Sequence, residues 1–356
     1  MTRPAAAPMP LAMIDVSAPL RLRLDTAALV RNWRALDRMS GRAACGAAIK
    51  ANGYGLGAGE VASRLAGAGC RDFFVATWAE AVALAPLALP LAVLHGVRDE
   101  DMAAATTGIA RPVLSTPSQV ARWRDAGGGA CDVMVDTGMN RLGVSAQDIA
   151  DGLLDGLAID TLMSHLACAD EDSAMNEAQR GRFAALAGRT GARRMSLANS
   201  AGVALGTDYA FDLTRPGLAL YGGVPSAALA GAVRPVATIE AQILQRRRVQ
   251  AGETVGYNAT WTAAGPTEVA IVNLGYADGY WRGFSDRGVA FAGDAPLPVI
   301  GRVSMDLVAL DVGAAPLAEG DWIAIPHDLP AAAAQSGMSQ YELLTGLGRR
   351  FTRMWT

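Results

Sequence analysis

The chain has 356 residues, of which 51% are hydrophobic, and it carries a net charge of −3 at neutral pH. This length is enough for about two domains, each with a buried core. The longest basic run is Arg246 to Arg248, and this scarcity of clustered positive charge argues against nucleic acid or an anionic membrane as the main partner. No uncharged apolar run reaches the roughly 18 residues of a membrane span, and prolines at 4, 8 and 10 interrupt any leader-like segment. We therefore expect a cytoplasmic globular protein with a small-molecule ligand.

The four cysteines are far apart in the sequence and form no CxxC pair. They are Cys45, Cys70, Cys131 and Cys168. This spacing indicates neither a zinc site nor a disulfide framework, so we expect reduced thiols and no bound metal.

In chain order, the first structured segment is LRLRLD, Leu20 to Asp25, whose alternation predicts a strand. Between residues 43 and about 220, eight short apolar runs alternate with helical segments, which is typical of βα units around a parallel sheet. The runs are AACGAAIKA, DFFVATW, PLAVLHG, RPVLST, ACDVMVDTG, IDTLMSHLA, RRMSLANS and FDLTRPG. Eight such units in about 180 residues predict a (β/α)8 barrel, with a doubly wound open sheet as the alternative.

After about residue 230 the pattern changes to strand-like alternation broken by Gly, Pro and Asp turns. We therefore divide the chain into an N-terminal extension, residues 1–19, that could pack on the β domain, a barrel over residues 20–230 and a mainly β domain over residues 231–356.

Lys50 is the only lysine in the chain, and it ends the first of the eight runs. Arginine cannot replace a lysine that is needed as a primary amine, because the guanidinium group stays protonated and forms no Schiff base. Lys50 is therefore a candidate reactive amine, with an ordinary solvated lysine as the alternative.

Other reactive side chains fall at the ends of later runs, where the active site of a (β/α)8 barrel lies. His165 is near the end of the sixth run, Asn199 and Ser200 close the seventh, and Arg215 falls late in the eighth, while Arg141 follows the fifth. Taken singly, His165 fits a structural histidine and Ser200 a helix N-cap. Because all of these side chains fall at the ends of strands, their positions favour a single shared active site over separate structural roles.

The loops after the seventh and eighth runs begin NSAG and RPGLALYGG. They supply a hydroxyl group and glycines whose backbone N–H groups can approach a phosphate, which this type of barrel commonly binds there. A reactive lysine beside a phosphate pocket points to pyridoxal phosphate.

Six motifs, in the same order, resemble those of the alanine racemase family over nearly the whole chain. AAIKANGYGLG resembles the cofactor-lysine segment, VDTGMNRLGV the substrate-arginine loop, and ANSAG and RPGLALYG the cofactor contacts. NLGYADGYWR resembles the catalytic-tyrosine segment and GRVSMD the substrate-carboxylate segment. The resemblance implies a barrel followed by a β domain, with pyridoxal phosphate as cofactor.

The resemblance also implies the roles of individual residues. Lys50 would form the Schiff base and act as one acid/base, and Tyr276 would act from the opposite face, with His165 and Arg215 as its neighbours. Arg215 would face the pyridine nitrogen and Arg141 the substrate carboxylate. The remaining implied positions are Tyr54, Ser200, Gly217, Leu218 and Tyr341 at the phosphate, the backbone of Met305 at the carboxylate, and Asp306 and Asn199 as supporting residues.

In the family, the tyrosine and methionine come from the partner subunit, so the resemblance implies a homodimer with shared sites. One position departs from the pattern. Many family members have a lysine, often carbamylated, that orients the substrate arginine, whereas this chain has Met134 there. Arg141 must then be held in another way, such as by a bound anion or a different side chain.

Three alternatives remain open from the sequence. The chain could racemise another amino acid, such as lysine, arginine or serine; it could be a pyridoxal-phosphate decarboxylase with the same two domains; or it could be a barrel-only cofactor carrier. Arg215 argues against a decarboxylase, which generally has an acidic residue at the pyridine nitrogen, and residues 231–356 argue against a barrel-only protein. The physiological direction, making D-alanine for the cell wall or consuming it, is also open.

Overall fold

The computed structural model describes residues 17–356, which form two compact units. The barrel unit comprises residues 24–238, 326–347 and 355–356, and the β unit comprises residues 17–23, 239–325 and 348–354. Residues 1–16 of the predicted N-terminal extension lie outside the described residues, so its predicted packing on the β domain is not tested there. At its end, the Pro19 carbonyl accepts a hydrogen bond of 3.0 Å from the Gln242 backbone N–H in the β unit.

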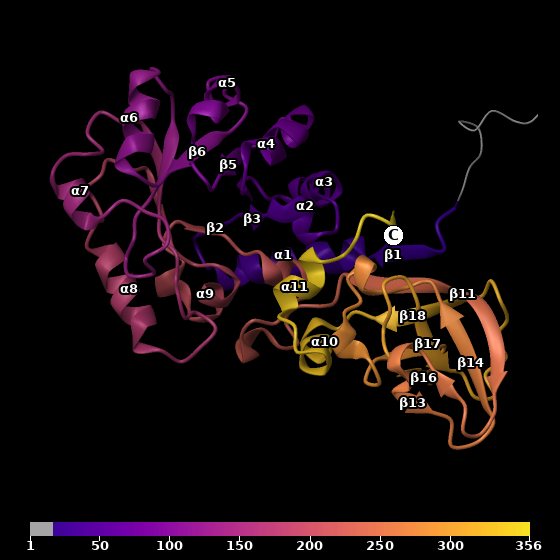
Figure 1. The fold of residues 1–356 in the computed structure, drawn as a ribbon. Helices are drawn as coiled ribbons and strands as arrows, with labels where there is room; N and C mark the ends of the chain where they lie inside the picture. Colours follow the sequence, from indigo (N-terminus) through magenta and orange to yellow (C-terminus); the bar gives the residue numbers. More distant parts are fainter. Residues whose placement is uncertain (1–16) are drawn as a thin grey trace, which may run out of the picture. The chain divides into compact units, whose positions relative to one another are not determined.

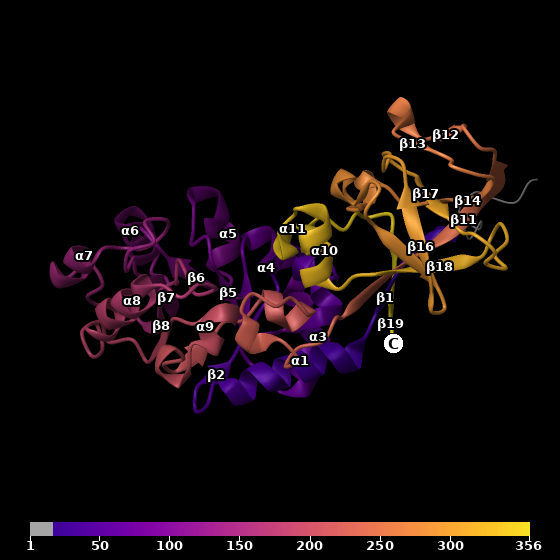
Figure 2. The same ribbon diagram turned by 90° about the horizontal axis from the view of Figure 1, so that it is seen from below.

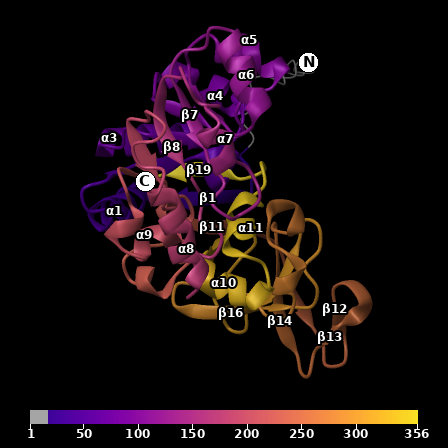
Figure 3. The ribbon, with the colours of Figure 1, turned by 90° about the vertical axis from the view of Figure 1, so that its left-hand side faces the viewer.

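The barrel unit is built on short parallel strands, which lie inside its helices in Figures 1 and 3. A seven-stranded sheet has the order β3-β4-β5-β6-β7-β8-β9, and β10 pairs with β2, the strand just before β3 in the chain. The strands are β2 (Ala44–Cys45), β3 (Ala47–Ala48), β4 (Phe73–Val75), β5 (Leu91–Val93), β6 (Arg111–Leu114), β7 (Cys131–Met134), β8 (Ile159–Met163), β9 (Arg194–Ser196) and β10 (Leu213–Thr214).

Two backbone hydrogen bonds close this sheet into a ring. The Asp212 N–H donates to the Met195 carbonyl at 3.0 Å, and the Arg215 N–H donates to the Ala198 carbonyl at 2.8 Å. Because β2 and β3 form one strand position interrupted at Gly46, the ring has eight positions. Each of the eight predicted runs contains one of them, so the (β/α)8 prediction is confirmed and the open-sheet alternative is wrong.

Helices surround the strands because their apolar faces need burial. In α1, for example, Leu29, Trp33 and Leu36 are buried, and threonine or serine caps the N-terminus of α4, α6, α7 and α8. The helices are α1 (Thr26–Met39), α2 (Lys50–Tyr54), α3 (Ala58–Ala68), α4 (Trp78–Leu84), α5 (Met102–Ala105), α6 (Pro117–Asp125), α7 (Ala146–Ala150), α8 (Ala174–Ala184) and α9 (Ser200–Ala204).

Two later helices, α10 (Leu329–Ser336) and α11 (Gln340–Thr345), belong to the barrel unit. The chain after α2 approaches α11 so closely that a Cβ atom on Gly55 would lie 2.4 Å from the Leu344 carbonyl oxygen. The barrel therefore includes a segment from the predicted 231–356 range. Conversely, β1 (Leu20–Leu24), from the predicted 20–230 range, lies between β11 and β19 in the sheet of the β unit.

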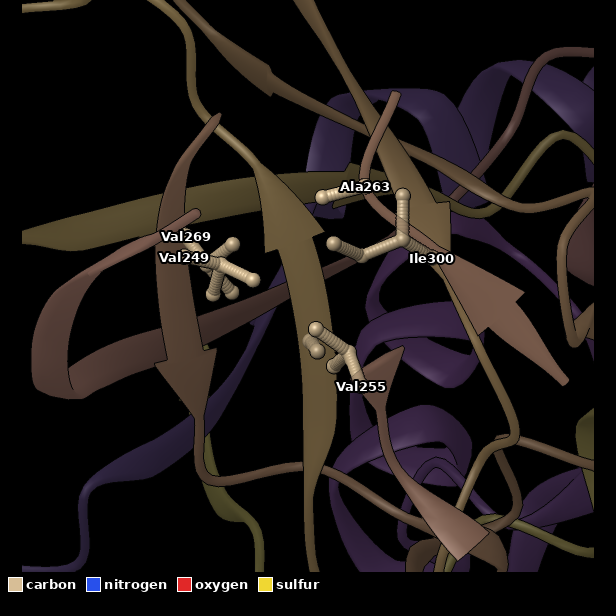
Figure 4. Packing of buried hydrophobic residues seen from close by; sticks show 6 residues of the cluster. Val249, Val255, Ala263, Val269 and Ile300 are labelled. Atoms are coloured by element: carbon tan, nitrogen blue, oxygen red, sulfur yellow. The ribbon is translucent and has the colours of Figure 1, made fainter. Parts of the chain in front are cut away.

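The β unit is a mainly antiparallel sheet that curls back on itself. Its order is β14-β17-β16-β15-β18-β11-β1-β19, and β14 also pairs with β11, so six of these strands close a ring. The strands β11, β14, β16, β17 and β18 lie together in Figures 1 and 2. Figure 4 shows part of its core, in which Val249, Val255, Val269 and Ile300 are buried. The strands are β11 (Ala237–Val249), β12 (Thr254–Val255), β13 (Trp261–Thr262), β14 (Thr267–Val272), β15 (Val289–Ala292), β16 (Ala295–Ile300), β17 (Val308–Asp311), β18 (Trp322–Pro326) and β19 (Thr352–Trp355).

Within residues 17–356, no helix has the length and apolar character that crossing a membrane requires.

Candidate active site

A cavity of about 430 Å³ lies at the carboxyl ends of the barrel strands, and all of its lining residues belong to the barrel unit. Ten of the predicted site residues line it: Lys50, Tyr54, Arg141, His165, Asn199, Ser200, Arg215, Gly217, Leu218 and Tyr341. The remaining three, Tyr276, Met305 and Asp306, belong to the β unit and do not line this cavity.

Lys50 begins α2, directly after β3, and its side chain is partly buried in the cavity. Burial lowers the pKa of the Lys50 amine, since removal from water disfavours its charged form. Arg141 and Arg215 lower this pKa further, whereas Glu80 raises it. The surroundings thus increase the fraction of free amine, which is the reactive form of lysine.

Aromatic side chains form one wall of the cavity. The buried Tyr54 ring stacks on Tyr221, with 4.7 Å between ring centroids, and its centroid lies 6.4 Å from that of Tyr341. Tyr221 also donates a hydrogen bond of 2.9 Å to the Ala48 carbonyl. A Cβ atom at Gly217 would lie 2.2 Å from Tyr54 Oη, so this approach requires glycine.

Ser200 joins the loops after β9 and β10. Its Oγ accepts hydrogen bonds from the backbone N–H groups of Gly217, at 2.9 Å, and Ala219, at 3.1 Å. The N-cap of α9 is Asn199, whose Oδ1 accepts from the Gly202 N–H at 2.9 Å. The Ser200 hydroxyl is therefore not used as the N-cap and faces the cavity instead.

Arg215 is a buried cation held by neutral groups. Its guanidinium donates to Ser196 Oγ and, at 2.5 Å, to the Ser164 carbonyl. Burial lowers the pKa of Arg215 to about 10, so the group remains protonated at neutral pH. None of the ion pairs among residues 17–356 involves Arg215.

His165 follows β8 and lies among these cations. Burial lowers the pKa of its imidazole to about 3, with further contributions from Arg215, Arg141 and Lys50. His165 is therefore neutral at physiological pH, and a neutral imidazole can accept a hydrogen bond at one nitrogen.

Arg141 lies in the loop between β7 and α7. Asp136 Oδ1 shapes this loop by accepting from the N–H groups of Gly138, at 2.8 Å, and Asn140, at 3.1 Å. The Arg141 side chain is exposed, and no carboxylate within the described ranges forms an ion pair with it. Met134 is buried and lines the cavity in the position where the family pattern has lysine.

In the β unit, the predicted Tyr276 and Met305 segments are joined to each other. The N–H of Tyr276 donates to the Ser304 carbonyl, and the N–H of Ala277 donates to the Met305 carbonyl, both at 3.0 Å. Arg282 lies over the Tyr276 ring, 5.2 Å from its centroid.

A buried carboxylate supports the same turn. Asp278 Oδ2 accepts from the Gly275 N–H at 3.0 Å, and Asp278 receives two hydrogen bonds from Arg350, at 2.7 and 2.8 Å. Arg350 also bonds Asp306 at 2.6 Å. A single arginine thus connects the Tyr276 turn with the residue after Met305.

Sequence reasoning missed three residues that lie behind the cavity wall and support its side chains or backbone: Tyr221, Glu80 and Ser164. Tyr221 lies within the RPGLALYGG motif, but its stacking on Tyr54 depends on the closure of the ring of strands. Glu80 stands three residues after Thr77, which is the sequence signature of a capping box. Ser164 binds Arg215 through its backbone carbonyl and therefore leaves no side-chain signal.

Two family models together match most of the chain. The model described as "Alanine racemase, N-terminal domain" matches residues 24–225, and "Alanine racemase, C-terminal domain" matches residues 236–355. The chain belongs to the alanine racemase family. The predicted family and its combination of a barrel with a β domain are confirmed, and the match to both domains leaves no support for a barrel-only protein.

Individual alanine racemases are similar over nearly their whole length. The chain is 45% identical to the alanine racemase of Acidiphilium cryptum, covering 94% of this chain and 98% of the relative, and 43% identical to that of Jannaschia sp., with 94% and 98% covered. The structure superposes on alanine racemase from Bartonella henselae, which has covalently bound pyridoxal phosphate, with a TM-score of 0.87 at 32% identity, covering 96% and 100% of the two chains.

Proposed function

We propose that the chain is a pyridoxal-phosphate-dependent alanine racemase that interconverts L-alanine and D-alanine, with Lys50 as the cofactor lysine. One observation carries this proposal: the only lysine of the chain lies in the cavity together with His165, Ser200 and Arg215. Family membership supports the same reaction, as does the covalently bound cofactor of the Bartonella henselae enzyme.

The residues of the cavity fit this cofactor. Gly217 lacks the Cβ atom that would meet Tyr54 Oη, and the N–H groups of Gly217 and Ala219 donate to the Ser200 hydroxyl at one end. Hydroxyl and backbone N–H groups of this kind bind phosphate oxygens. The Lys50 amine, whose pKa is lowered by burial, supplies the group that a pyridoxal aldehyde requires.

Racemisation requires two groups on opposite faces of the α-carbon. When bound, pyridoxal phosphate draws electron density away from the α-carbon and makes its proton acidic. Lys50 then accepts or donates this proton on one face, and Tyr276 does so on the other. Reversal of the two roles converts the enantiomers in the opposite direction.

The cations Arg215 and Arg141 have different tasks in this proposal. Arg215 is fixed by Ser196 and Ser164 and remains protonated, so it would disfavour a second positive charge on the pyridine nitrogen of a cofactor bound beside it. This limits electron withdrawal and favours racemisation over transamination. Arg141 binds the substrate carboxylate together with the Met305 backbone, and its exposed guanidinium is available for such an anion.

The active form is a homodimer, in which the β unit of the partner subunit supplies a tyrosine and a methionine to each site. The cavity is lined by the barrel unit alone, whereas Tyr276 and Met305 lie together in the β unit. The four cysteines are free thiols, which suits a reducing cytoplasm.

The reaction is tested by incubating the purified protein with L-alanine in heavy water. We expect D-alanine that carries deuterium at the α-carbon, together with slower or no turnover of L-lysine, L-arginine and L-serine. Alanine that keeps its configuration and its α-hydrogen would exclude the proposed mechanism. Faster turnover of another amino acid would show that this amino acid, and not alanine, is the main substrate.

The shared site is tested by mixing two inactive variants, Lys50→Ala and Tyr276→Phe. Random reassortment makes half of the dimers mixed, and each mixed dimer contains one intact site, so about a quarter of the wild-type site activity should return. Mixed dimers verified by mass spectrometry that remain inactive would contradict the shared site.

A further inference from the structure

The chain follows a left-handed turn directly after Lys50. Ala51, Asn52, Gly53 and Tyr54 have φ angles of 52°, 55°, 63° and 52°. A left-handed helical conformation costs roughly 1–2 kcal/mol for each residue that has a Cβ atom, and three of these four residues have one. Such a turn persists only where its surroundings hold it in place.

Hydrogen bonds within the turn supply part of this support. The Gly53 N–H donates to the Ile49 carbonyl at 2.8 Å, and the Gly55 N–H donates to the Ala51 carbonyl at 2.9 Å. The Ala51 N–H itself points out of the turn and needs an acceptor from elsewhere.

That acceptor is Glu80, in the first turn of α4. Its Oε1 accepts from the Ala51 N–H at 2.6 Å, while its Oε2 accepts from the N–H groups of Ala76, at 2.7 Å, and Thr77, at 3.2 Å. One carboxylate therefore joins the backbone beside Lys50 to the next βα unit of the barrel. Hydrogen bonds to an ionised carboxylate are shorter and stronger than those between neutral groups.

Glu80 also contributes a charge near Lys50. Within the described part of the chain, Glu80 is the one carboxylate among the groups that set the pKa of Lys50, and it raises this pKa against burial, Arg141 and Arg215. The cavity also contains His165, which is neutral, and Asp136, whose Oδ1 is occupied by two backbone N–H groups.

Helix capping alone does not account for Glu80. The capping box of α4 uses only Oε2, which accepts from the Thr77 N–H, and leaves Oε1 for Ala51. Asp148 in α7 provides the comparison. It forms the same capping box with Ser145, and in the described part of the chain its carboxylate accepts only from the Ser145 N–H and hydroxyl.

We propose that Glu80 is a positioning residue for Lys50, which fixes the left-handed turn by accepting the Ala51 N–H and so sets the direction in which Lys50 enters the cavity. This inference rests on the proposed function only in assigning Lys50 to the cofactor. The tie between Glu80 and the turn does not depend on which reaction the cavity carries out.

The tie is tested by residue-resolved hydrogen exchange at the Ala51 amide of the full-chain protein. Glu80→Gln keeps a single acceptor oxygen, and Glu80→Asp keeps the charge on a shorter side chain. We expect the protection factor of the Ala51 amide to fall at least tenfold in both variants. Asp148→Asn is the matched control: it removes a capping-box carboxylate from another barrel helix and should leave Ala51 protected. Equal protection in all four proteins would overturn the proposal.

A second measurement uses the fact that Lys50 is the only lysine. The pH dependence of its acetylation in the apoprotein, followed by peptide mass spectrometry, gives the pKa of a single side-chain amine. We expect this pKa to be lower in Glu80→Gln than in the wild type, close to wild type in Glu80→Asp, and unchanged in Asp148→Asn. An unchanged value in Glu80→Gln would refute the charge contribution.

These readouts separate the two proposals. If the wild-type protein neither binds pyridoxal phosphate nor racemises alanine, the proposed function fails, while hydrogen exchange at Ala51 still decides the role of Glu80. If the wild type is active and the Ala51 amide exchanges at the same rate in Glu80→Gln and Asp148→Asn, the proposed role of Glu80 is wrong, whereas the proposed function stands. Should Glu80→Gln not fold, Glu80→Asp carries the exchange test.

Discussion

Tyr54 Oη lies against the α-carbon of Gly217, so closely that a methyl group at residue 217 would be 2.2 Å from the phenol oxygen. Tyr54 is confined on its other side by the stacked ring of Tyr221 and cannot move away freely. This contact places a tyrosine hydroxyl beside the backbone N–H groups that we assign to the phosphate end of the cavity.

Gly217→Ala should therefore weaken the binding of pyridoxal phosphate. Overpacking costs about 1–3 kcal/mol, which corresponds to a loss of about 5- to 150-fold in affinity if the cost falls on the bound state. Fluorescence titration of the apoprotein measures this affinity. Gly59→Ala is the control, because a Cβ atom there meets nothing within 4 Å, and it should leave affinity unchanged. Unchanged affinity in Gly217→Ala would contradict the assignment of this end of the cavity.

Met134→Lys would restore the residue of the family pattern. The new ammonium is buried without a partner, so we expect the melting temperature to fall. Carbon dioxide in equilibrium with added bicarbonate should bond to the neutral lysine amine, with loss of one proton, and the resulting anionic carbamate can attract Arg141 and lower the KM for alanine. Met134→Leu, similar in volume and apolar, should show no response to bicarbonate. A KM that does not depend on bicarbonate would mean that Arg141 is already held in its binding geometry.

Arg350→Ala should disturb the Tyr276 turn. It removes both hydrogen bonds to Asp278, whose side chain is 0% exposed, and leaves this carboxylate buried without its ion pair. Because Arg350 is itself half-exposed, we expect a loss of about 2 kcal/mol in the free energy of unfolding. The kcat should fall as well. Arg349→Ala, at the exposed neighbouring residue, is the control for both measurements, and equal kcat values in the two variants would argue against a catalytic Tyr276 turn.

His165 makes the stability of the apoprotein depend on pH. Its folded pKa of about 3 lies below the unfolded value of 6.5, so between these values the unfolded state binds more protons and stability is lost as pH falls. His165→Gln should remove this loss, so that its stability relative to the wild type rises by about 2 kcal/mol between pH 7 and pH 5. Chemical unfolding at both pH values measures the difference. His327, with a pKa of about 4, is present in both proteins, so its contribution to the pH dependence cancels in the comparison. Parallel pH profiles of the two proteins would show that His165 is not buried as a neutral group.

Much of the barrel could be predicted because its strands are short, apolar and regularly spaced. Phe73, Phe74 and Val75, for example, are all buried, as expected for a parallel strand covered on both faces. The positions of Lys50, Ser200 and Arg215 followed from the same rule, since side chains at the carboxyl ends of the strands meet in one place.

The boundary between the units could not be predicted in the same way. The helices Leu329–Ser336 and Gln340–Thr345 lie in the range predicted as mainly β, and tertiary contacts place them with the barrel core. Tyr341 was therefore assigned to the phosphate by resemblance, whereas its place in the barrel unit was missed. The tie between Glu80 and Ala51 was out of reach for a related reason, because a left-handed turn at an alanine and a tyrosine is opposed by local preference and depends on a distant carboxylate.

The return of the chain to the barrel with α10 and α11 has a consequence for folding during synthesis. A ribosome releases the eight strands early, but the aromatic wall of the cavity lacks Tyr341 until residue 347 has emerged. Residues 239–325, the largest segment of the β unit, must be made first. The nascent chain therefore holds its only lysine in an incomplete pocket for most of translation, and a truncated chain that ends before α11 would expose the Tyr54 ring on the side that Tyr341 faces.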